Sequence, residues 1–168
     1  VKISRLTIRN QSTRKRRLSI TAYVEWVLGS SRAASAPFVV TEVDPGTGVL
    51  LARNPWSNEH GDRVACADLG GRQTSWTGDR SEFLGRHGTL ARPAVLAGIA
   101  PLSGRVGVGL DPCGALQTSI ELAPGATAEI AFILGEEASK SAALALVERY
   151  RAKDLGAVLA GVTRYWDG

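Results

Sequence analysis

The sequence is poor in the residues that most often carry chemistry: its 168 residues include two histidines, two cysteines and no methionine. Cys66 and Cys113 lack the spacing of a zinc site and are too few for a disulfide framework, so we expect free thiols in a reducing compartment. No apolar run approaches the roughly 18 residues that cross a bilayer, and no secretory segment opens the chain. These absences predict a soluble segment on the cytoplasmic side. A valine start and an apolar pattern that runs to the last residues predict a piece of a longer protein.

Motifs for nucleophilic catalysis and phosphate binding are also missing. No serine lies in a GxSxG elbow and no GxxxxGK[ST] loop occurs. The glycines from Gly104 to Gly109 fall inside a strand-like pattern, and His60 and His87 are expected in exposed loops. The sequence therefore predicts no cofactor and no metal site.

Positive charge is concentrated at one end of the chain. The net charge is +4, and residues 1–17 contain seven of the 20 Lys and Arg residues and no acid. A nucleic-acid module would add aromatic side chains for base stacking, yet the first aromatic residue is Tyr23. We interpret the cluster as a solvated basic hairpin tip, with contact to phosphate or another polyanion as the alternative, and expect no nucleic-acid partner.

Alternating apolar residues dominate the chain and predict a mainly β fold. Residues 3–9 and 18–28 are expected to form one antiparallel hairpin, and residues 38–43 and 48–53 a second one around Asp44-Pro45-Gly46-Thr47. A weaker strand is expected over residues 64–69. Three further strands, over residues 106–110, 116–122 and 128–134, are expected to form a meander.

The apolar period changes to that of helices near the C-terminus. Ser139 is a candidate N-cap for a helix to about Arg151, and Asp154 for a second helix. The second helix carries an apolar stripe that includes Val158, Val162 and Trp166. The prediction is an antiparallel β-sandwich of about eight short strands followed by two helices.

Charged and aromatic residues crowd the segment from Thr74 to Pro93, which we call the corner segment. Asp79 and Glu82 could be a carboxylate pair for glycoside hydrolysis. Arg80 and Arg86 would keep both acids ionised, whereas a general acid needs a raised pKa, so structural ion pairing is favoured. A stand-alone hydrolase that uses Asp79 or Glu82 is kept as an alternative.

Four tryptophans could include platforms on which a sugar ring stacks. Trp26 and Trp166 are in register with apolar faces and are expected in the core. Trp56 and Trp76 are expected in polar loops and are the better ligand candidates, although large aromatic residues also anchor loops.

The order of several motifs is similar to that of a known family. TGDRSEFLGRHG from Thr77, ARNPWSNE from Ala52 and GVGLDPCGALQ from Gly107 resemble segments of the N-terminal β-sandwich of inverting glycoside phosphorylases, which include cellobiose and chitobiose phosphorylases. The resemblance looks closest to the phosphorylase-like region of cyclic β-1,2-glucan synthases.

This resemblance implies a "supersandwich" over residues 1–135 and a helical linker over residues 136–168 that leads to an (α/α) barrel with the catalytic residues. It implies a non-catalytic segment of a glucan synthase or phosphorylase, with an inner-membrane parent protein. Expected partners are a β-glucan or oligosaccharide, the catalytic barrel and a second copy of the chain; an autonomous carbohydrate-binding module is the other alternative. The candidate contacts are Trp56, Trp76, Asp79, Arg80, Arg86 and His87, and the candidate docking face is Val158, Val162 and Trp166.

Overall fold

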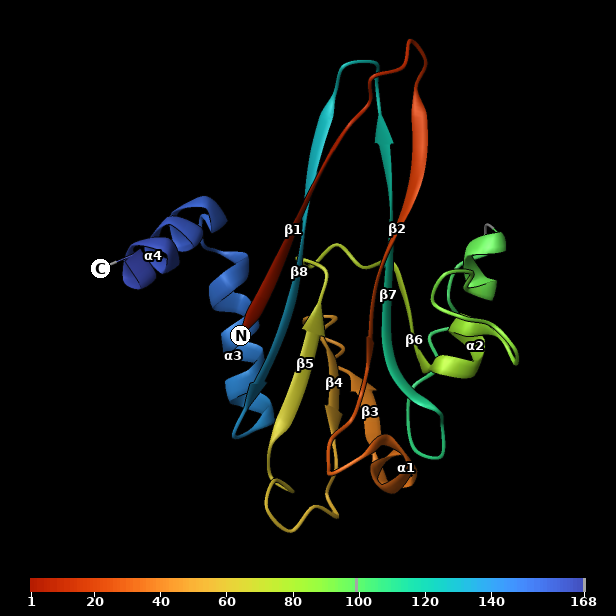
Figure 1. Cartoon of the computed structure of the whole chain (residues 1–168), viewed down its shortest axis with the longest axis vertical. Coiled ribbons are helices and arrows are strands. Elements are labelled where there is room, and N and C mark those ends of the chain that lie inside the picture. Colours follow the sequence, from red (N-terminus) through yellow and green to blue (C-terminus); the bar gives the residue numbers. More distant parts are fainter. Residues whose placement is uncertain (99, 168) are drawn as a thin grey trace.

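The computed structural model describes residues 1–98 and 100–167, and its eight strands form two antiparallel sheets (Figure 1). The larger sheet has the order β1-β8-β5-β4-β3 and the smaller one the order β2-β7-β6. This confirms the predicted mainly β sandwich with two C-terminal helices. The strands are β1 (Lys2–Arg9), β2 (Arg16–Glu25), β3 (Val40–Val43), β4 (Leu50–Arg53), β5 (Val64–Asp68), β6 (Ser75–Asp79), β7 (Pro112–Leu122) and β8 (Thr127–Glu137).

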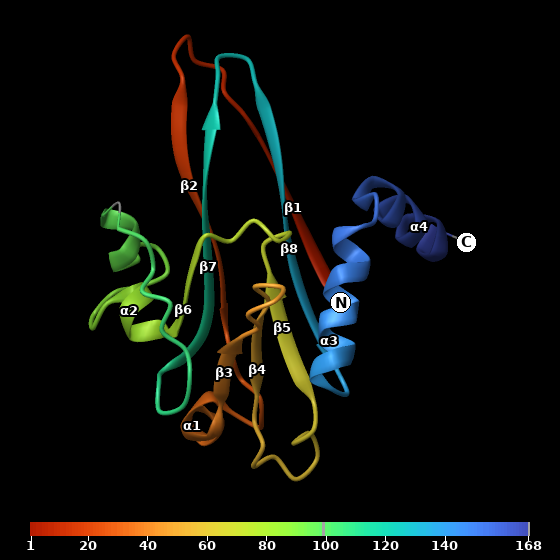
Figure 2. The ribbon, with the colours of Figure 1, turned by 180° about the vertical axis from the view of Figure 1, so that it is seen from behind.

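The predicted pairing of β1 with β2 is wrong. β1 pairs with β8 and β2 pairs with β7, so the loop from β1 to β2 and the turn from β7 to β8 both cross between the sheets. Both crossings lie at the same end of the sandwich (Figures 1 and 2). Alternation correctly indicates which residues of a strand share a face, but it does not specify the strand's partner.

Asn10 joins the two crossings. Its side-chain amide donates to the carbonyls of Arg14 and Leu122, both at 2.9 Å. Its backbone N–H donates to the Ala126 carbonyl at 2.9 Å, and its own carbonyl accepts from the Gly125 N–H at 2.8 Å. Asn10 is buried, so these bonds satisfy polar groups that would otherwise destabilise the tip.

Three hydrophobic clusters arrange the molecule in four layers. The inner cluster fills the space between the sheets and includes Trp26, Leu50 and Leu116. The helix α3 (Lys140–Arg151) covers the larger sheet, and α2 (Arg80–Leu84) with the short helix η2 (Ala94–Ala97) covers the smaller one. The other elements are α1 (Arg32–Ser35), the short helix η1 (Ala36–Phe38) and α4 (Leu155–Asp167).

The hairpin of β3 and β4 is confirmed, but the predicted three-strand meander is wrong. Residues 106–110 are irregular, and β7 and β8 lie in different sheets. Gly104, Gly107 and Gly109 have positive φ, which interrupts the extended backbone that alternation suggested. This segment instead runs beside two sheet edges: the Gly78 N–H donates to the Arg105 carbonyl, and the Thr41 N–H donates to the Gly107 carbonyl.

Both C-terminal helices begin as predicted. The Ser139 side chain accepts from the Ala142 N–H, and the Asp154 side chain accepts from the Gly156 and Ala157 N–H groups. α3 buries Ala143, Leu146 and Val147 against the larger sheet, whereas α4 buries none of its side chains. In the part of the chain that the structure describes, neither helix is long and apolar enough to cross a membrane.

Candidate functional site

The corner segment is a strand followed by a short helix rather than a loop. β6 ends at Asp79, whose side chain accepts from the Ser81 N–H at 2.9 Å and so caps α2. α2 ends at Gly85, whose φ of 82° favours glycine. Phe83 and Leu84 are buried, and the ring of Phe83 stacks on Tyr23 of β2 with centroids 4.4 Å apart. Phe83 and Leu84 thus anchor the corner segment to the smaller sheet.

The two carboxylates of this segment are engaged in holding the local structure. Asp79 accepts from the guanidinium of Arg105 at 3.0 Å. Glu82 accepts from the Thr77 hydroxyl at 2.6 Å and from the Ser103 hydroxyl at 2.7 Å. Burial alone would raise the pKa of Glu82, but these hydrogen bonds and nearby Arg105 lower it below its usual value. A carboxyl held in the ionised form is poorly suited to general-acid catalysis.

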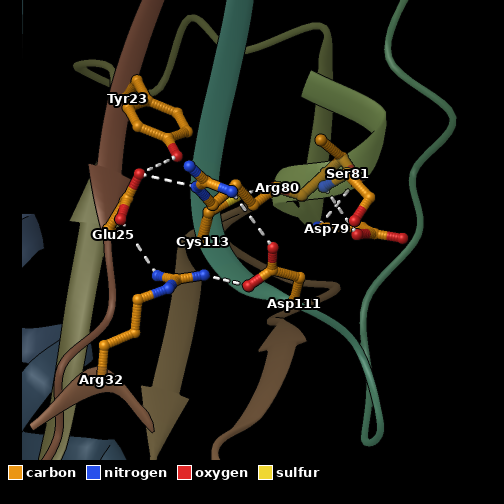
Figure 3. Close-up of polar contacts among 9 residues, drawn as sticks. Tyr23, Glu25, Arg32, Asp79, Arg80, Ser81, Asp111 and Cys113 are labelled. Carbon is orange, nitrogen blue, oxygen red and sulfur yellow. Dashed lines mark hydrogen bonds and ion pairs between the residues drawn. The ribbon is translucent and has the colours of Figure 1, made fainter. Parts of the chain in front are cut away.

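Arg80 belongs to a network of alternating charges at one end of the smaller sheet (Figure 3). Its guanidinium donates to Glu25 at 2.9 Å and to Asp111 at 3.4 Å. Arg32 of α1 also donates to Glu25, at 3.0 Å, and to Asp111. The network thus connects β2, α1, α2 and the residue before β7.

Hydrogen bonds from two sides set the charge state of Glu25. Tyr23 donates its hydroxyl to Glu25 at 2.8 Å. Burial would raise the pKa of Glu25, but hydrogen bonds from Arg80 and Tyr23, together with the charge of Arg32, lower it. Burial and the hydrogen bond to Glu25 raise the pKa of Tyr23. The network therefore favours the ionised form of Glu25 between the two arginines.

This network was not predicted, because its members are far apart in the sequence and only the fold brings Arg32 and Asp111 to Glu25 and Arg80. Cys113 lies behind it and is buried, as is Cys66 of β5, and both are free thiols. Burial raises the pKa of Cys66 to about 11 and that of Cys113 to about 12. Thiols with such pKa values are poor nucleophiles.

Arg86 and His87 lie in the turn after α2 and are exposed. Among the described residues, neither forms an ion pair with an acid. The turn that carries them packs closely against α2: a Cβ atom on Gly88 would lie 1.6 Å from the Leu84 carbonyl oxygen, and the Gly88 N–H donates to the Gly85 carbonyl at 3.3 Å. The corner therefore presents two cationic or hydrogen-bonding side chains from an anchored turn.

The tryptophans do not all lie where the sequence suggested. Trp26 is in the core, as predicted, at 3% exposure. Trp76 lies in β6 and packs half-buried against the inner cluster, so its placement in a polar loop is wrong. Trp166 is 77% exposed in the described structure, so its placement in the core is also wrong. Trp56 lies in a polar loop as predicted and is 75% exposed.

The candidate docking face lies on α4, on the opposite side of the molecule from α2 (Figure 1). Val158 is half-buried, whereas Val162 and Trp166 are exposed. A groove of about 370 Å³ separates α4 from the start of β1 and is lined by Val158, Leu159 and Val162. The candidate residues thus form three separate regions: the corner segment, the Trp56 loop and α4. In residues 1–98 and 100–167, no three His, Cys, Asp or Glu side chains come together as metal ligands do.

Comparison with known proteins gives two findings. The family model described as "Glycosyl hydrolase 94, supersandwich domain" matches residues 1–153. Over 165 residues, the chain is 38% identical to a protein of Rhizobium meliloti (strain 1021) named cyclic beta-(1,2)-glucan synthase NdvB. This alignment covers 98% of the chain but 6% of the relative's length. The similarity therefore extends across both sheets and α3, within a relative that is many times longer.

Proposed function

The chain belongs to the supersandwich domain family of glycosyl hydrolase 94, and from this premise we propose that it is the non-catalytic β-sandwich of a glucan-active enzyme. In this proposal the domain packs against a catalytic domain through α4 and shapes the rim of that domain's glucan site. A relative named as a glucan synthase supports the substrate class. The division into a sandwich over residues 1–135 and a helical linker over residues 136–168 is part of the same proposal.

The exposed apolar stripe of α4 is the observation that carries this proposal. Val158, Leu159, Val162 and Trp166 recur at helical spacing, yet the helix buries none of its side chains. A contiguous exposed apolar patch on a protein surface commonly marks an interaction site. A catalytic domain that covers this stripe would bury it.

The corner segment supports the second part of the proposal. Asp79, Arg80 and Glu82 stabilise the turn through side-chain contacts, so they are occupied. Arg86 and His87 are the exposed polar side chains next to this fixed structure. We infer that they contact the sugar or the catalytic domain at the rim.

The alternative of a stand-alone hydrolase has weaker support. Asp79 is held by Arg105, and Glu82 is held by Thr77 and Ser103. Neither side chain is therefore free to act as the general acid or as the second carboxylate that glycoside hydrolysis requires. We expect the 168-residue chain to show no turnover of β-1,2-gluco-oligosaccharides, with or without phosphate. Turnover that disappears in Asp79→Asn would contradict the proposal.

The docking face can be tested separately from catalysis. We expect Val162→Asp to leave the free energy of unfolding of the 168-residue chain within about 0.5 kcal/mol of the original, because Val162 is already exposed. The same substitution should weaken binding of this chain to the catalytic domain, produced as a separate polypeptide, by tenfold or more, roughly the effect of burying an unpaired charge in an apolar contact. Calorimetric titration measures the affinity.

Ala160→Asp provides the matched control. Ala160 is exposed on the same helix, and the 100° rotation per residue places it on a different side from Val158 and Val162. It introduces the same charge and should leave the affinity unchanged. Equal losses in both variants, or no loss in Val162→Asp, would argue against α4 as the docking face.

A further inference from the structure

The loop between β4 and β5 exposes an aromatic pair that the core does not use. Trp56 is 75% exposed, in contrast to Trp26 at 3%. The ring of Phe38, from η1, lies beside the Trp56 ring with centroids 5.8 Å apart and an interplanar angle of 37°. Phe38 is itself exposed. Two neighbouring aromatic rings open to water are an unusual use of large apolar side chains in a domain with three well-filled hydrophobic clusters.

Hydrogen bonds of the buried Asn54 fix the backbone that carries the indole. The Asn54 side chain is buried; it donates to the Leu28 carbonyl at 2.7 Å and accepts from the backbone N–H of Trp56 at 3.1 Å. The Ser57 N–H donates to the Asn54 carbonyl at 3.1 Å. At the far end of the loop, a Cβ atom on Gly61 would lie 2.7 Å from the Ser57 carbonyl oxygen. Because the loop is fixed by these contacts, little conformational entropy would be lost when a ligand binds to Trp56.

Two adjoining hollows lie beside Trp56 and contain polar groups. The larger has a volume of about 610 Å³ and the smaller about 290 Å³, and both are lined by Gly29, Ser30, Asn54 and Ser57. Phe38 and Trp56 line the smaller hollow. The larger is lined by hydrogen-bonding side chains of both kinds, donors and acceptors: Asn58, Glu59, His60, Arg63 and Glu136.

We propose that Trp56, Phe38 and these hollows form a non-catalytic binding site for a β-linked gluco-oligosaccharide. A pyranose ring has an apolar C–H face that packs on an indole and hydroxyl edges that need donors and acceptors, so it matches both linings. Arg63 and Glu136 in the larger hollow already pair with each other, but a purely apolar partner would cover the other polar side chains of the lining without offering them hydrogen bonds, which is unfavourable. The choice of a β-glucan rests on the function proposed above, while the class of ligand, a neutral oligosaccharide, rests on the lining.

The site predicts a localised response to sugar. In a two-dimensional ¹H–¹⁵N NMR titration of the 168-residue chain with linear β-1,2-gluco-oligosaccharides at millimolar concentration, we expect the indole N–H resonance of Trp56 to shift and that of Trp166 to stay in place. Trp56→Ala should lower the affinity about fivefold or more, since one aromatic stack contributes roughly 1 kcal/mol. Trp166→Ala is the matched control, because Trp166 is equally exposed at 77%.

The stability of Trp56→Ala shows whether a loss of affinity comes from the binding site or from unfolding. Trp56 contributes little to the core, so Trp56→Ala should unfold at the same denaturant concentration as the original chain. An unchanged affinity in Trp56→Ala, or an unmoved Trp56 resonance, would overturn the site. If Trp56→Ala weakens binding to the catalytic domain and leaves the sugar affinity unchanged, this surface is a protein interface and the proposal is wrong. Each of these results leaves the test of α4 unaffected, so the two proposals can fail separately.

Discussion

At the scale of a single residue, Glu25 joins three elements, β2, α1 and α2. It is the last residue of β2, and it accepts from Tyr23 and from two arginines, Arg32 and Arg80. Both arginines also contact Asp111, so each charge in the network faces two opposite charges (Figure 3). Removing one acid would leave two guanidinium groups close together with a single carboxylate.

We therefore expect Glu25→Gln to lower the free energy of unfolding at pH 7 by about 1 kcal/mol, a modest value because the groups are partly open to solvent that screens them. Folding lowers the pKa of Glu25 from 4.5, so its stabilising contribution is present above about pH 4.5 and is lost as the pH falls through the folded-state pKa. Urea unfolding between pH 3 and pH 7 measures this.

Glu148→Gln is the control for that experiment, because Glu148 is exposed on α3. It should reproduce the pH dependence of the original chain, whereas Glu25→Gln should show a smaller loss of stability on acidification. The role of Glu25 would be contradicted if the two variants had the same pH profile.

Gly88 gives a second prediction at this scale. A Cβ atom there would overlap the Leu84 carbonyl oxygen, whereas at Gly46 the nearest atom is an Asp44 carboxylate oxygen at an ordinary 3.5 Å. We expect Gly88→Ala to destabilise the chain by about 2 kcal/mol and Gly46→Ala to have little effect. Equal unfolding midpoints for the two variants would show that the turn after α2 adapts without cost.

At the scale of elements, the two C-terminal helices differ in how they are attached. α3 is packed on the larger sheet, and Arg151 in its last turn pairs with Asp68, which is fully buried. The Arg151 Nε–H donates to Asp68 at 3.0 Å, and its guanidinium also donates to the Thr47 carbonyl at 2.9 Å. Among residues 1–98 and 100–167, no ion pair joins α4 to the sheets, so the position of α4 depends on where this pair holds the end of α3.

We expect Arg151→Met to destabilise the chain by about 3 kcal/mol, because it leaves the buried Asp68 carboxylate without its cation. Arg149→Met, on the exposed side of the same helix, should cost much less. Chemical denaturation of both variants and of the Asp68→Asn/Arg151→Met double variant would measure the coupling. If Asp68 and Arg151 interact directly, the double variant should lose less free energy of unfolding than the two single variants lose together. A loss equal to that sum would contradict a direct pair.

Local signals in the sequence specified the elements better than their partners. Ser139, Asp154 and the Asp44-Pro45-Gly46-Thr47 turn each act within a few residues, and the predicted caps and hairpin are present. The pairing of β1 with β8 joins opposite ends of the chain and depends on the packing of both sheets. Alternation carries no information about such pairing.

The candidate sites were predictable to a similar extent. Trp56 was found because an aromatic residue in a polar loop is a local signal. Its neighbour Phe38 and the network of Glu25, Arg32 and Asp111 are brought together by tertiary structure. Trp166 was misplaced because an apolar helical stripe has the same pattern whether the described chain covers it or leaves it exposed.

At the scale of the whole molecule, the strands and helices differ in their expected local stability. β5 is buried on both faces and β7 lies in the middle of its sheet, whereas α4 has no buried side chain. Hydrogen–deuterium exchange of the 168-residue chain should therefore be slowest in β5 and β7 and fastest in α4. Protection of α4 equal to that of α3 would show that α4 is held by this chain alone.

The two crossings at one end of the sandwich also have a consequence for synthesis. β1 and β2 are synthesised before their partners β8 and β7, because β3 to β6 lie between them in the chain. Until β7 and β8 have been made, these two strands expose unpaired backbone groups that could pair with other chains. The seven cations among residues 1–17 lie in and between these strands, and like charges hinder such association. We infer that this basic cluster protects the nascent chain from such association until β7 and β8 have been made.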